Sequence, residues 1–150
     1  MFSFMREYPN LNMSTIHQIR GDAFQYFTEC GIVEDQVADL LIAVGEIATD
    51  AVEHGHDTVL TVTATYCSGR LEICFCSESL SVNRGLISDR IASIEAGETI
   101  CFVETGRGLG MRWFCALAQS VEITDDGKLR ASFDTSNWLP EARRCLCMVA

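Results

Sequence analysis

The stretch from Val44 to Gly55, VGEIATDAVEHG, is the strongest single indication of fold in this chain. Its apolar residues recur three and four positions apart and continue a pattern that begins at Val37. This spacing predicts one long amphipathic helix from about Val33 to His54, ended by Gly55. Because a helix turns by about 100° per residue, the acidic residues of the stretch fall together on the side opposite the apolar stripe.

Two of these acidic residues, Glu46 and Asp50, lie one helical turn apart in a helix without lysine or arginine. Like charges at this spacing cost roughly 0.2–0.5 kcal/mol in an isolated helix. A divalent cation would remove that cost, and Mg²⁺ is typically held by one or two carboxylates together with phosphates and water. A carboxylate beside such an ion can also accept a proton from an attacking hydroxyl group. Paired acids are also common on helix faces that bind nothing, so the spacing alone leaves both interpretations open.

A second motif, ETGRGLGM from Glu104 to Met111, opens a helix predicted from Gly106 to Gln119. Glycines let the backbone approach an anion closely, and the start of a helix offers unpaired N–H groups and a partial positive charge. Arg107 and Arg112 would add charge-assisted contacts. The spacing is not that of the P-loop, and no strand precedes it as the dinucleotide fingerprint requires. The motif therefore predicts a phosphate-binding turn, with a tight packing turn as the simpler alternative.

The remaining elements are predicted from hydrophobic periodicity and turn residues. In chain order they are an edge strand over Phe2–Met5, a helix over Thr15–Glu29 closed by Cys30-Gly31, strands over Thr58–Tyr66 and Arg70–Cys76 joined at Ser68-Gly69, a short helix near Leu86–Glu95, and strands over Val121–Thr124 and Leu129–Phe133 joined at Asp126-Gly127. Helices combined with hairpin-paired strands predict an α+β fold. We expect a two-layer sandwich with one mixed, mainly antiparallel sheet that helices cover on one face.

Length and charge narrow the possible functions. The 150 residues suit a single domain, and the formal net charge of −10 argues against a nucleic-acid-binding surface. No apolar run approaches the ~20 residues of a membrane-spanning helix, and the first ten residues do not resemble a signal peptide, so we expect a soluble, cytoplasmic protein without a membrane partner. No basic residue lies between Arg20 and Arg70, a stretch rich in Asp and Glu. That stretch suits a bound cation or a basic partner, or it is a solvated acidic face.

The eight cysteines show no paired C-x-x-C spacing that would indicate a zinc site. We therefore expect reduced thiols that act as small core residues. Cys74 and Cys76 would share one face of a strand.

The two motifs, in this order and separated by two strands and an irregular segment, resemble those of the histidine-kinase-like ATPase superfamily, which has the Bergerat fold. The short chain with an early helix and a terminal hairpin is similar to the anti-sigma-factor serine/threonine kinase branch. The resemblance covers about residues 10–135 and leaves 136–150 as a tail. The family's Glu-x-x-x-Asn-Ala-x-x-His motif is matched at Glu46, Ala51 and His54, with Asp50 in the place of asparagine. Its Gly-x-Gly-Leu-Gly motif is matched at Gly106, Gly108, Leu109 and Gly110.

The resemblance implies roles for these residues and the cofactors ATP and Mg²⁺. Glu46 would be the catalytic base, with a possible water-mediated contact to the metal, and Asp50 the magnesium-side ligand. The lid would be 83–103. His54 would contact the nucleotide or cap the helix end, where a histidine faces the helix dipole favourably. The phosphate cradle would be Thr105, Gly106, Arg107, Gly108, Leu109 and Gly110.

One family motif is missing. Where the family has an Asp-x-Gly-x-Gly box that reads the adenine amino group, this sequence has CSESLS from Cys76 to Ser81. Ser77 or Glu78 would have to supply the acceptor oxygen. Two functions remain open: a kinase that uses Mg-ATP to phosphorylate serine or threonine on an anti-anti-sigma (STAS-type) partner, or a protein that sequesters a sigma factor or regulator without nucleotide. A homodimer is compatible with the apolar early helix.

Overall fold

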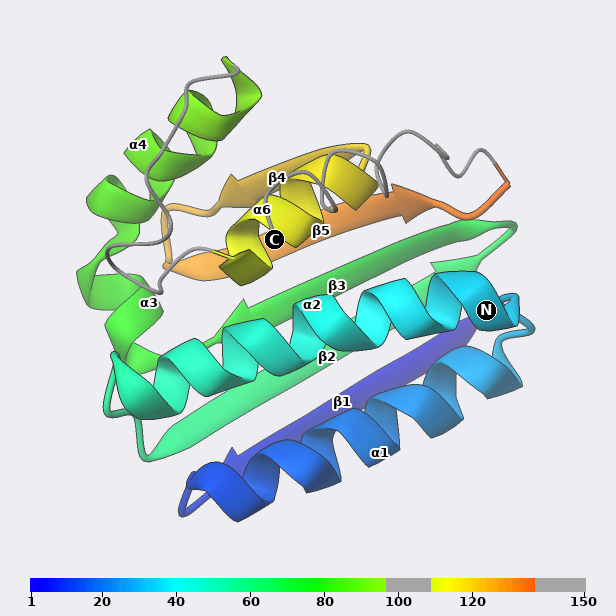
Figure 1. Cartoon of the computed structure of the whole chain (residues 1–150), viewed down its shortest axis with the longest axis horizontal. Helices are drawn as coiled ribbons and strands as arrows, with labels where there is room; N and C mark the ends of the chain where they lie inside the picture. Colours follow the sequence, from blue (N-terminus) through cyan, green and yellow to red (C-terminus); the bar gives the residue numbers. More distant parts are fainter. Residues whose placement is uncertain (97–108, 137–150) are drawn as a thin grey trace.

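The computed structural model describes residues 1–96 and 109–136. In this part of the chain five strands form one sheet in the order β1-β2-β3-β5-β4 (Figure 1). The elements in chain order are β1 (Phe2–Pro9), α1 (Met13–Glu29), α2 (Glu34–Glu53), β2 (Val59–Cys67), β3 (Arg70–Cys76), α3 (Glu78–Val82), α4 (Arg84–Glu95), α6 (Leu109–Leu117), β4 (Ser120–Ile123) and β5 (Lys128–Asp134).

All four pairs of neighbouring strands are antiparallel, so the prediction of a mixed sheet is wrong for the described strands. The connection between β1 and β2 explains why. A single crossover helix would return the chain to the end where β1 began and make the next strand parallel. Here two helices, α1 and α2, run in opposite directions between them, so β2 starts where β1 ended (Figure 1).

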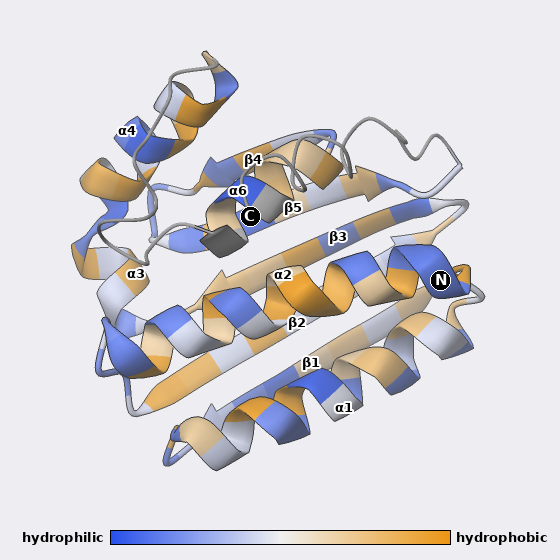
Figure 2. Cartoon of the chain, in the orientation of Figure 1, coloured by the Kyte–Doolittle hydropathy of each residue, from blue (hydrophilic) through white to orange (hydrophobic). Residues whose placement is uncertain are grey.

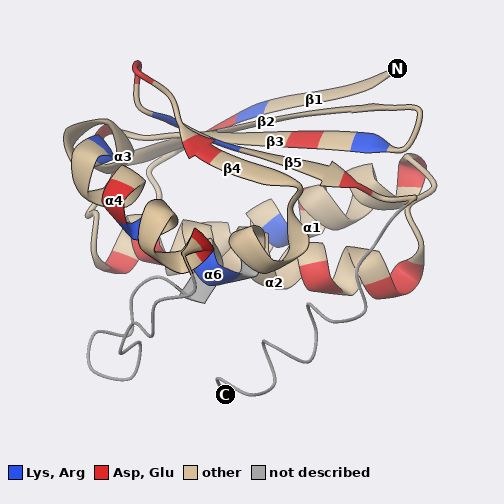
Figure 3. Cartoon of the chain, turned by 90° about the horizontal axis from the view of Figure 1, so that it is seen from above, with Lys and Arg blue, Asp and Glu red and all other residues tan. Residues whose placement is uncertain are grey.

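The fold has two layers, with α1, α2 and α6 on one face of the sheet (Figure 3). Alternate residues of β2, β3 and β5 are buried, as period-two hydrophobic patterning requires. Figure 2 colours each residue of these strands by its hydropathy. Phe114 of α6 is fully buried, and its ring lies 5.6 Å from that of Phe75 and 5.8 Å from that of Phe133. The predicted α+β class and the layer of helices on one face are confirmed.

Strand β1 is longer than predicted, and hydrogen bonds and an ion pair join it to α1. The Tyr8 hydroxyl donates to Asp22 Oδ2 at 2.8 Å, and the Arg6 guanidinium forms an ion pair with the same oxygen at 3.0 Å. The Tyr26 hydroxyl donates to the backbone oxygen of Phe2 at 2.9 Å. Burial, and then the bond to Asp22, hold the pKa of the Tyr8 phenol well above its usual value. These contacts hold the edge strand in place along its whole length.

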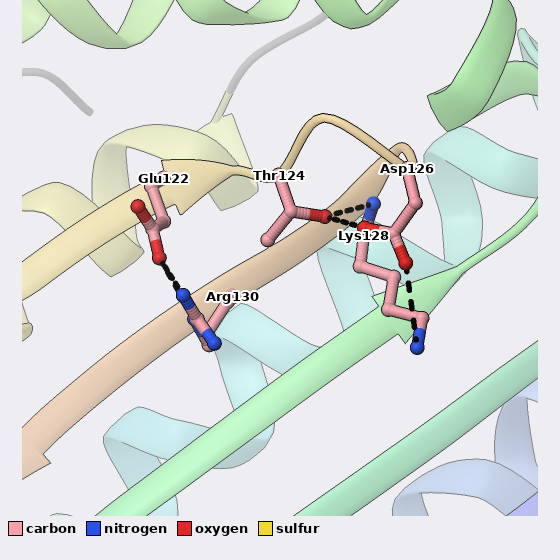
Figure 4. A network of polar contacts seen from close by, with 5 residues as sticks. All are labelled: Glu122, Thr124, Asp126, Lys128 and Arg130. Carbon is pink, nitrogen blue, oxygen red and sulfur yellow. Dashed lines mark hydrogen bonds and ion pairs between the residues drawn. The ribbon is translucent and has the colours of Figure 1, made fainter.

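Both predicted hairpins are present. Ser68 and Gly69 have φ of 51° and 81°, the left-handed conformation that a two-residue hairpin loop requires. In the second hairpin the Thr124 hydroxyl donates to the Asp126 carboxylate and accepts the Lys128 N–H at 3.0 Å (Figure 4). The bond from Thr124 is the main reason that the pKa of Asp126 is lowered.

The second hairpin turn also packs against α3. A Cβ atom built on Gly127, whose φ is 83°, would lie 2.6 Å from Cα of Ser81. The Arg84 guanidinium donates to the backbone oxygen of Asp125. The β4–β5 turn therefore supports the corner where α3 and α4 meet.

The segment after β3 is more regular than predicted. Helix α4 agrees with the expected helix near Leu86–Glu95, whereas α3 was not expected at all. Helix α6 begins at Leu109, and the start of its predicted range, 106–108, lies outside the described residues. The cradle residues 105–108, the lid residues 97–103 and the tail from 137 also lie outside them. Across the described ranges, no helix is long and apolar enough to cross a membrane.

Five cysteines lie in the described part of the chain, and all are free thiols. Cys30 and Cys115 are half-buried and pack against the core, whereas Cys67 is exposed and Cys74 and Cys76 are half-buried outside the core, so the expectation of core cysteines is wrong for these three residues. Cys74 and Cys76 lie at alternate positions on the outward face of β3, as predicted. Burial raises the pKa of the Cys30, Cys74 and Cys115 thiols, which favours their protonated forms.

Candidate functional site

A pocket of about 140 Å³ lies at the C-terminal end of α2. Helix α2 contributes one face to it, formed by Ile47, Asp50, Ala51 and His54. These residues follow one another at the three- and four-residue spacing that brings side chains to a common side of a helix. The same end of α2 lies beside α3 and the beginning of α4 (Figure 1).

The opposite wall comes from the segment predicted to be a lid. Asn83, Leu86, Ile87 and Arg90 line the pocket, again at helical spacing on one side of α4. Met111, in the first turn of α6, completes this wall. Two helices that are far apart in the sequence thus face one another across a small cavity.

The pocket combines apolar walls with a few polar groups that converge from three helices. Asp50 brings a carboxylate, Arg90 a guanidinium group, and His54 an imidazole; Ser79 and Asn83 add a hydroxyl and an amide. A mainly apolar cavity with a small number of placed polar groups is the usual composition of a site for a small organic ligand. The lining residues therefore include both hydrogen-bond acceptors and donors.

Asp57, Ser77 and Ser79 form a network of polar contacts at the base of the pocket, which is called the floor below. Asp57 is 8% exposed, and its carboxylate accepts the Ser79 backbone N–H at 2.9 Å and the Ser79 hydroxyl at 2.5 Å. The hydroxyl oxygens of Ser77 and Ser79 are 3.3 Å apart. Gly55 lies against this network, since a Cβ atom there would be 2.4 Å from Ser79 Oγ and 2.7 Å from Asp57 Oδ2.

The structure separates the residues that the sequence grouped together. Asp50 and His54 line the pocket, while Glu46 is half-buried one turn earlier on α2 and is not part of the lining. Ser77 is buried as the N-cap of α3, where its Oγ accepts the Leu80 N–H at 3.3 Å, and Glu78 is exposed at the start of the same helix. Neither of these two lines the pocket.

The glycine motif is described only from its end. Leu109 and Gly110 are the first residues of α6, and Met111 directly after them lines the pocket. The residues from Thr105 to Gly108 lie outside the described ranges. Of the described residues of the motif, Met111 is therefore the one that lines the pocket.

Sequence reasoning missed Asp57, Ser79, Asn83 and Arg90. Asn83 and Arg90 lie in the predicted lid, 83–103, and their spacing with the apolar residues between them is the signal that could have placed them on one helix face. Asp57 and Ser79 carry no periodic signal, because their contact joins positions 22 residues apart.

The acidic stretch between Arg20 and Arg70 is not one solvated face. Asp39 and Asp57 are buried, with 5% and 8% exposure, and Asp22 is paired with Arg6. Among the described residues, no group of three or more His, Cys, Asp or Glu side chains is arranged to hold a metal ion. A cation at this site would need further ligands from a bound molecule or from water.

A second, wider hollow of about 510 Å³ lies where the end of α4 meets α6 and β4. Arg112, Cys115 and Glu95 are among the residues that line it. Burial, and then the nearby charge of Glu95, raise the pKa of the Cys115 thiol to about 12. This hollow contains none of the α2 motif residues, so the pocket at the end of α2 is the better candidate site.

The fold and the pocket define a two-layer α+β protein with a small, apolar-walled site between α2 and α4. A scan against models of known protein families gave no match, and neither did a search among curated proteins.

Proposed function

We propose that this chain is a Bergerat-type nucleotide-binding protein of the anti-sigma-factor kinase branch, which binds Mg-ATP and phosphorylates serine or threonine on an anti-anti-sigma (STAS-type) partner. One observation carries the proposal. Two residues of the α2 motif, Asp50 and His54, line a cavity whose other wall is the segment expected to be the lid. The helix after the glycine motif contributes to the same cavity through Met111.

The size and composition of the cavity support a site for the base of a nucleotide. Its volume of about 140 Å³ is smaller than the ~300 Å³ or more of pockets that enclose drug-sized ligands. The cavity would therefore hold one part of a nucleotide, such as the base, and not the whole molecule. A planar base would lie between apolar side chains such as Ile47 and Ile87, and polar groups at the rim would contact its edge. The sugar and phosphates would lie outside this cavity, toward the glycine motif, whose helix start favours anions.

The donor set fits magnesium held mainly by the nucleotide. Mg²⁺ usually keeps several waters and takes one or two protein carboxylates in addition to phosphate oxygens. Asp50 is the carboxylate that lines the pocket. The ion, when bound, neutralises charge that develops on the transferred phosphoryl group.

Glu46 is placed one helical turn from Asp50, and this spacing supports its role as the base. In the proposed reaction the partner's hydroxyl oxygen attacks the γ-phosphorus, the bond to the β,γ-bridging oxygen breaks, and ADP leaves. Glu46 accepts the hydroxyl proton. Catalysis would come mainly from positioning and charge stabilisation, as in other phosphoryl transfers.

A second candidate is sequestration of a sigma factor or regulator without nucleotide. The observation that favours it is the structure of the segment after β3. The stretch from Cys76 to Ser81 has no glycine and no aspartate, and Ser77 caps a short helix, α3, at that place. A partner's basic surface would be complementary to the chain's net charge of −10.

Calorimetric titration with ATP, with and without magnesium, tests the proposal. Wild-type protein is expected to bind ATP in a magnesium-dependent manner. Asp50→Ala, which removes the ligand oxygen, should lose most of that magnesium dependence, whereas Glu53→Ala, a change at an exposed carboxylate on the same helix, should leave it intact. Absence of binding at millimolar Mg-ATP would overturn the nucleotide-binding proposal and leave sequestration.

The kinase step needs a separate assay. Purified STAS-type proteins from the same organism are incubated with the chain and ATP labelled at the γ-phosphate. Label is expected on a serine or threonine of one of them, and Glu46→Gln should abolish transfer while it keeps ATP binding. If Glu46→Gln transfers label as fast as the wild type, Glu46 is not the base.

A further inference from the structure

We infer that Ser79, held by the buried carboxylate of Asp57, is the group that selects the base, and that it selects a base with an exocyclic amino group over one with a carbonyl oxygen. The inference rests on the proposed nucleotide site. It assigns the selecting group to a residue other than Ser77 or Glu78, and it follows from the direction of the hydrogen bonds around the Ser79 hydroxyl.

The proton of the Ser79 hydroxyl is committed to Asp57. An ionised carboxylate accepts hydrogen bonds and has none to donate. At 2.5 Å from Asp57 Oδ2, Ser79 Oγ must therefore be the donor. The Ser79 backbone N–H occupies the other carboxylate oxygen at 2.9 Å, so both oxygens of Asp57 hold the same residue in place.

The neighbouring hydroxyl fixes the next bond in the chain. Ser77 Oγ accepts the Leu80 backbone N–H at 3.3 Å and lies 3.3 Å from Ser79 Oγ. Because the proton of Ser79 points to Asp57, the bond between the two hydroxyl groups must be donated by Ser77. A hydroxyl oxygen has two acceptor sites. The bond from Ser77 takes one, and the other remains on a residue that lines the pocket.

Ser79 therefore faces a ligand as an acceptor, made more basic by its bond to a buried carboxylate. An N–H of an amino group would complete its hydrogen bonding. A carbonyl oxygen at the same place would bring two acceptors together and leave both without a proton. A site that offers a fixed polar group discriminates strongly against the ligand that cannot pair with it.

ATP and inosine triphosphate form a matched pair of probes, because inosine carries a carbonyl oxygen where adenosine carries the amino group. Both are titrated calorimetrically into wild-type protein with magnesium. The wild type is expected to bind ATP at least about ten-fold more tightly, the size of one well-formed hydrogen bond. In Ser79→Ala the ratio of the two dissociation constants should fall close to one.

Asp57→Asn gives the sharper result. The asparagine oxygen is needed by the Ser79 backbone N–H, so its NH₂ group must face Ser79 Oγ and donate to it. The Ser79 proton is then released toward the pocket, and the preference should fall or invert in favour of inosine triphosphate. Ser81→Ala, an exposed serine of the same helix, is the matched control and should keep the wild-type ratio.

The outcomes separate the two proposals. Equal binding of the two nucleotides by the wild type, or an unchanged ratio in Ser79→Ala, would overturn the inference while the nucleotide site stands. No binding of either nucleotide by the wild type would overturn both. Thermal melting of each variant shows whether it is folded, and Ser79→Ala keeps the test decisive if Asp57→Asn does not fold.

Discussion

Substitution of Gly55 by alanine tests the close packing beside the pocket. The added Cβ would lie 2.4 Å from Ser79 Oγ, 2.8 Å from Ser79 Cβ and 2.7 Å from Asp57 Oδ2, all shorter than real Cβ contacts. Ser79 cannot swing away freely, because two hydrogen bonds tie it to Asp57. Gly55 is not among the residues with positive φ, so the backbone accepts alanine and the effect is steric.

Two contributions, overpacking and a disturbed hydrogen bond, set the expected loss of stability in Gly55→Ala. Overpacking costs about 1–3 kcal/mol, and disturbance of a hydrogen bond to a charged group adds about 1.5–3 kcal/mol if the bond breaks. We expect Gly55→Ala to lower the free energy of unfolding by about 2–4 kcal/mol and Tm by roughly 5–15 °C. ATP affinity should fall as well, because Gly55 lines the pocket.

Urea unfolding at 25 °C, with thermal melting, measures the effect against a matched control. Gly21 lies inside α1, and a Cβ there would have no atom within 4 Å. Gly21→Ala should therefore raise the free energy of unfolding by about 0.5–1 kcal/mol through helix propensity. The reasoning is refuted if Gly55→Ala is as stable as the wild type, since the floor of the pocket could not then be packed as described.

Three further predictions concern the core, the edge strand and a buried thiol. Phe114→Ala should lower the free energy of unfolding in urea by about 3–5 kcal/mol, because it empties the space between two other rings; a loss below about 1 kcal/mol would contradict this packing. Tyr8→Phe should cost about 1 kcal/mol in the same assay, and an unchanged stability would show that the bond to Asp22 contributes nothing. The pKa of the Cys115 thiol is raised from 9.0 to about 12, so its contribution to stability is complete below pH 9 and is lost as pH rises toward 12. Urea titrations at several pH values should show a shallower alkaline decline in Cys115→Ala than in the wild type, and parallel declines would contradict the assignment.

Local patterns predicted the elements, whereas the sheet order came from contacts that no local pattern contains. The long helix α2 and the Asp126-Gly127 hairpin follow from periodicity and turn residues. The position of β5 beside β3, with β4 at the edge, depends on packing against Phe114 and its neighbours. Helix α3 was not predicted, because five residues are too few to show a 3.6-residue period.

The candidate site was likewise predictable only where a local pattern places its residues on one helix face. Asp50 and His54 share a helix face, so their common approach to a pocket follows from spacing alone. The partnership of Asp57 with Ser79 joins a loop to a helix 22 residues away and depends on burial, which a single sequence does not show. Glu46 lies outside the lining, because the pocket is nearer the C-terminal end of α2.

The serines after β3 also explain how the chain packs closely around α3 without a glycine between Ser77 and Ser81. Glycine in such a loop allows close approach because it lacks a side chain. Here the glycines stand on the neighbouring elements: Gly55 makes room for the Ser79 side chain, and Gly127 makes room for the backbone of Ser81. The space that a glycine would leave open on α3 is filled by hydroxyl groups, and one of them lines the pocket. The absence of glycines from Cys76 to Ser81 is therefore compatible with the proposed ligand site, because this corner offers an acceptor held by a buried carboxylate.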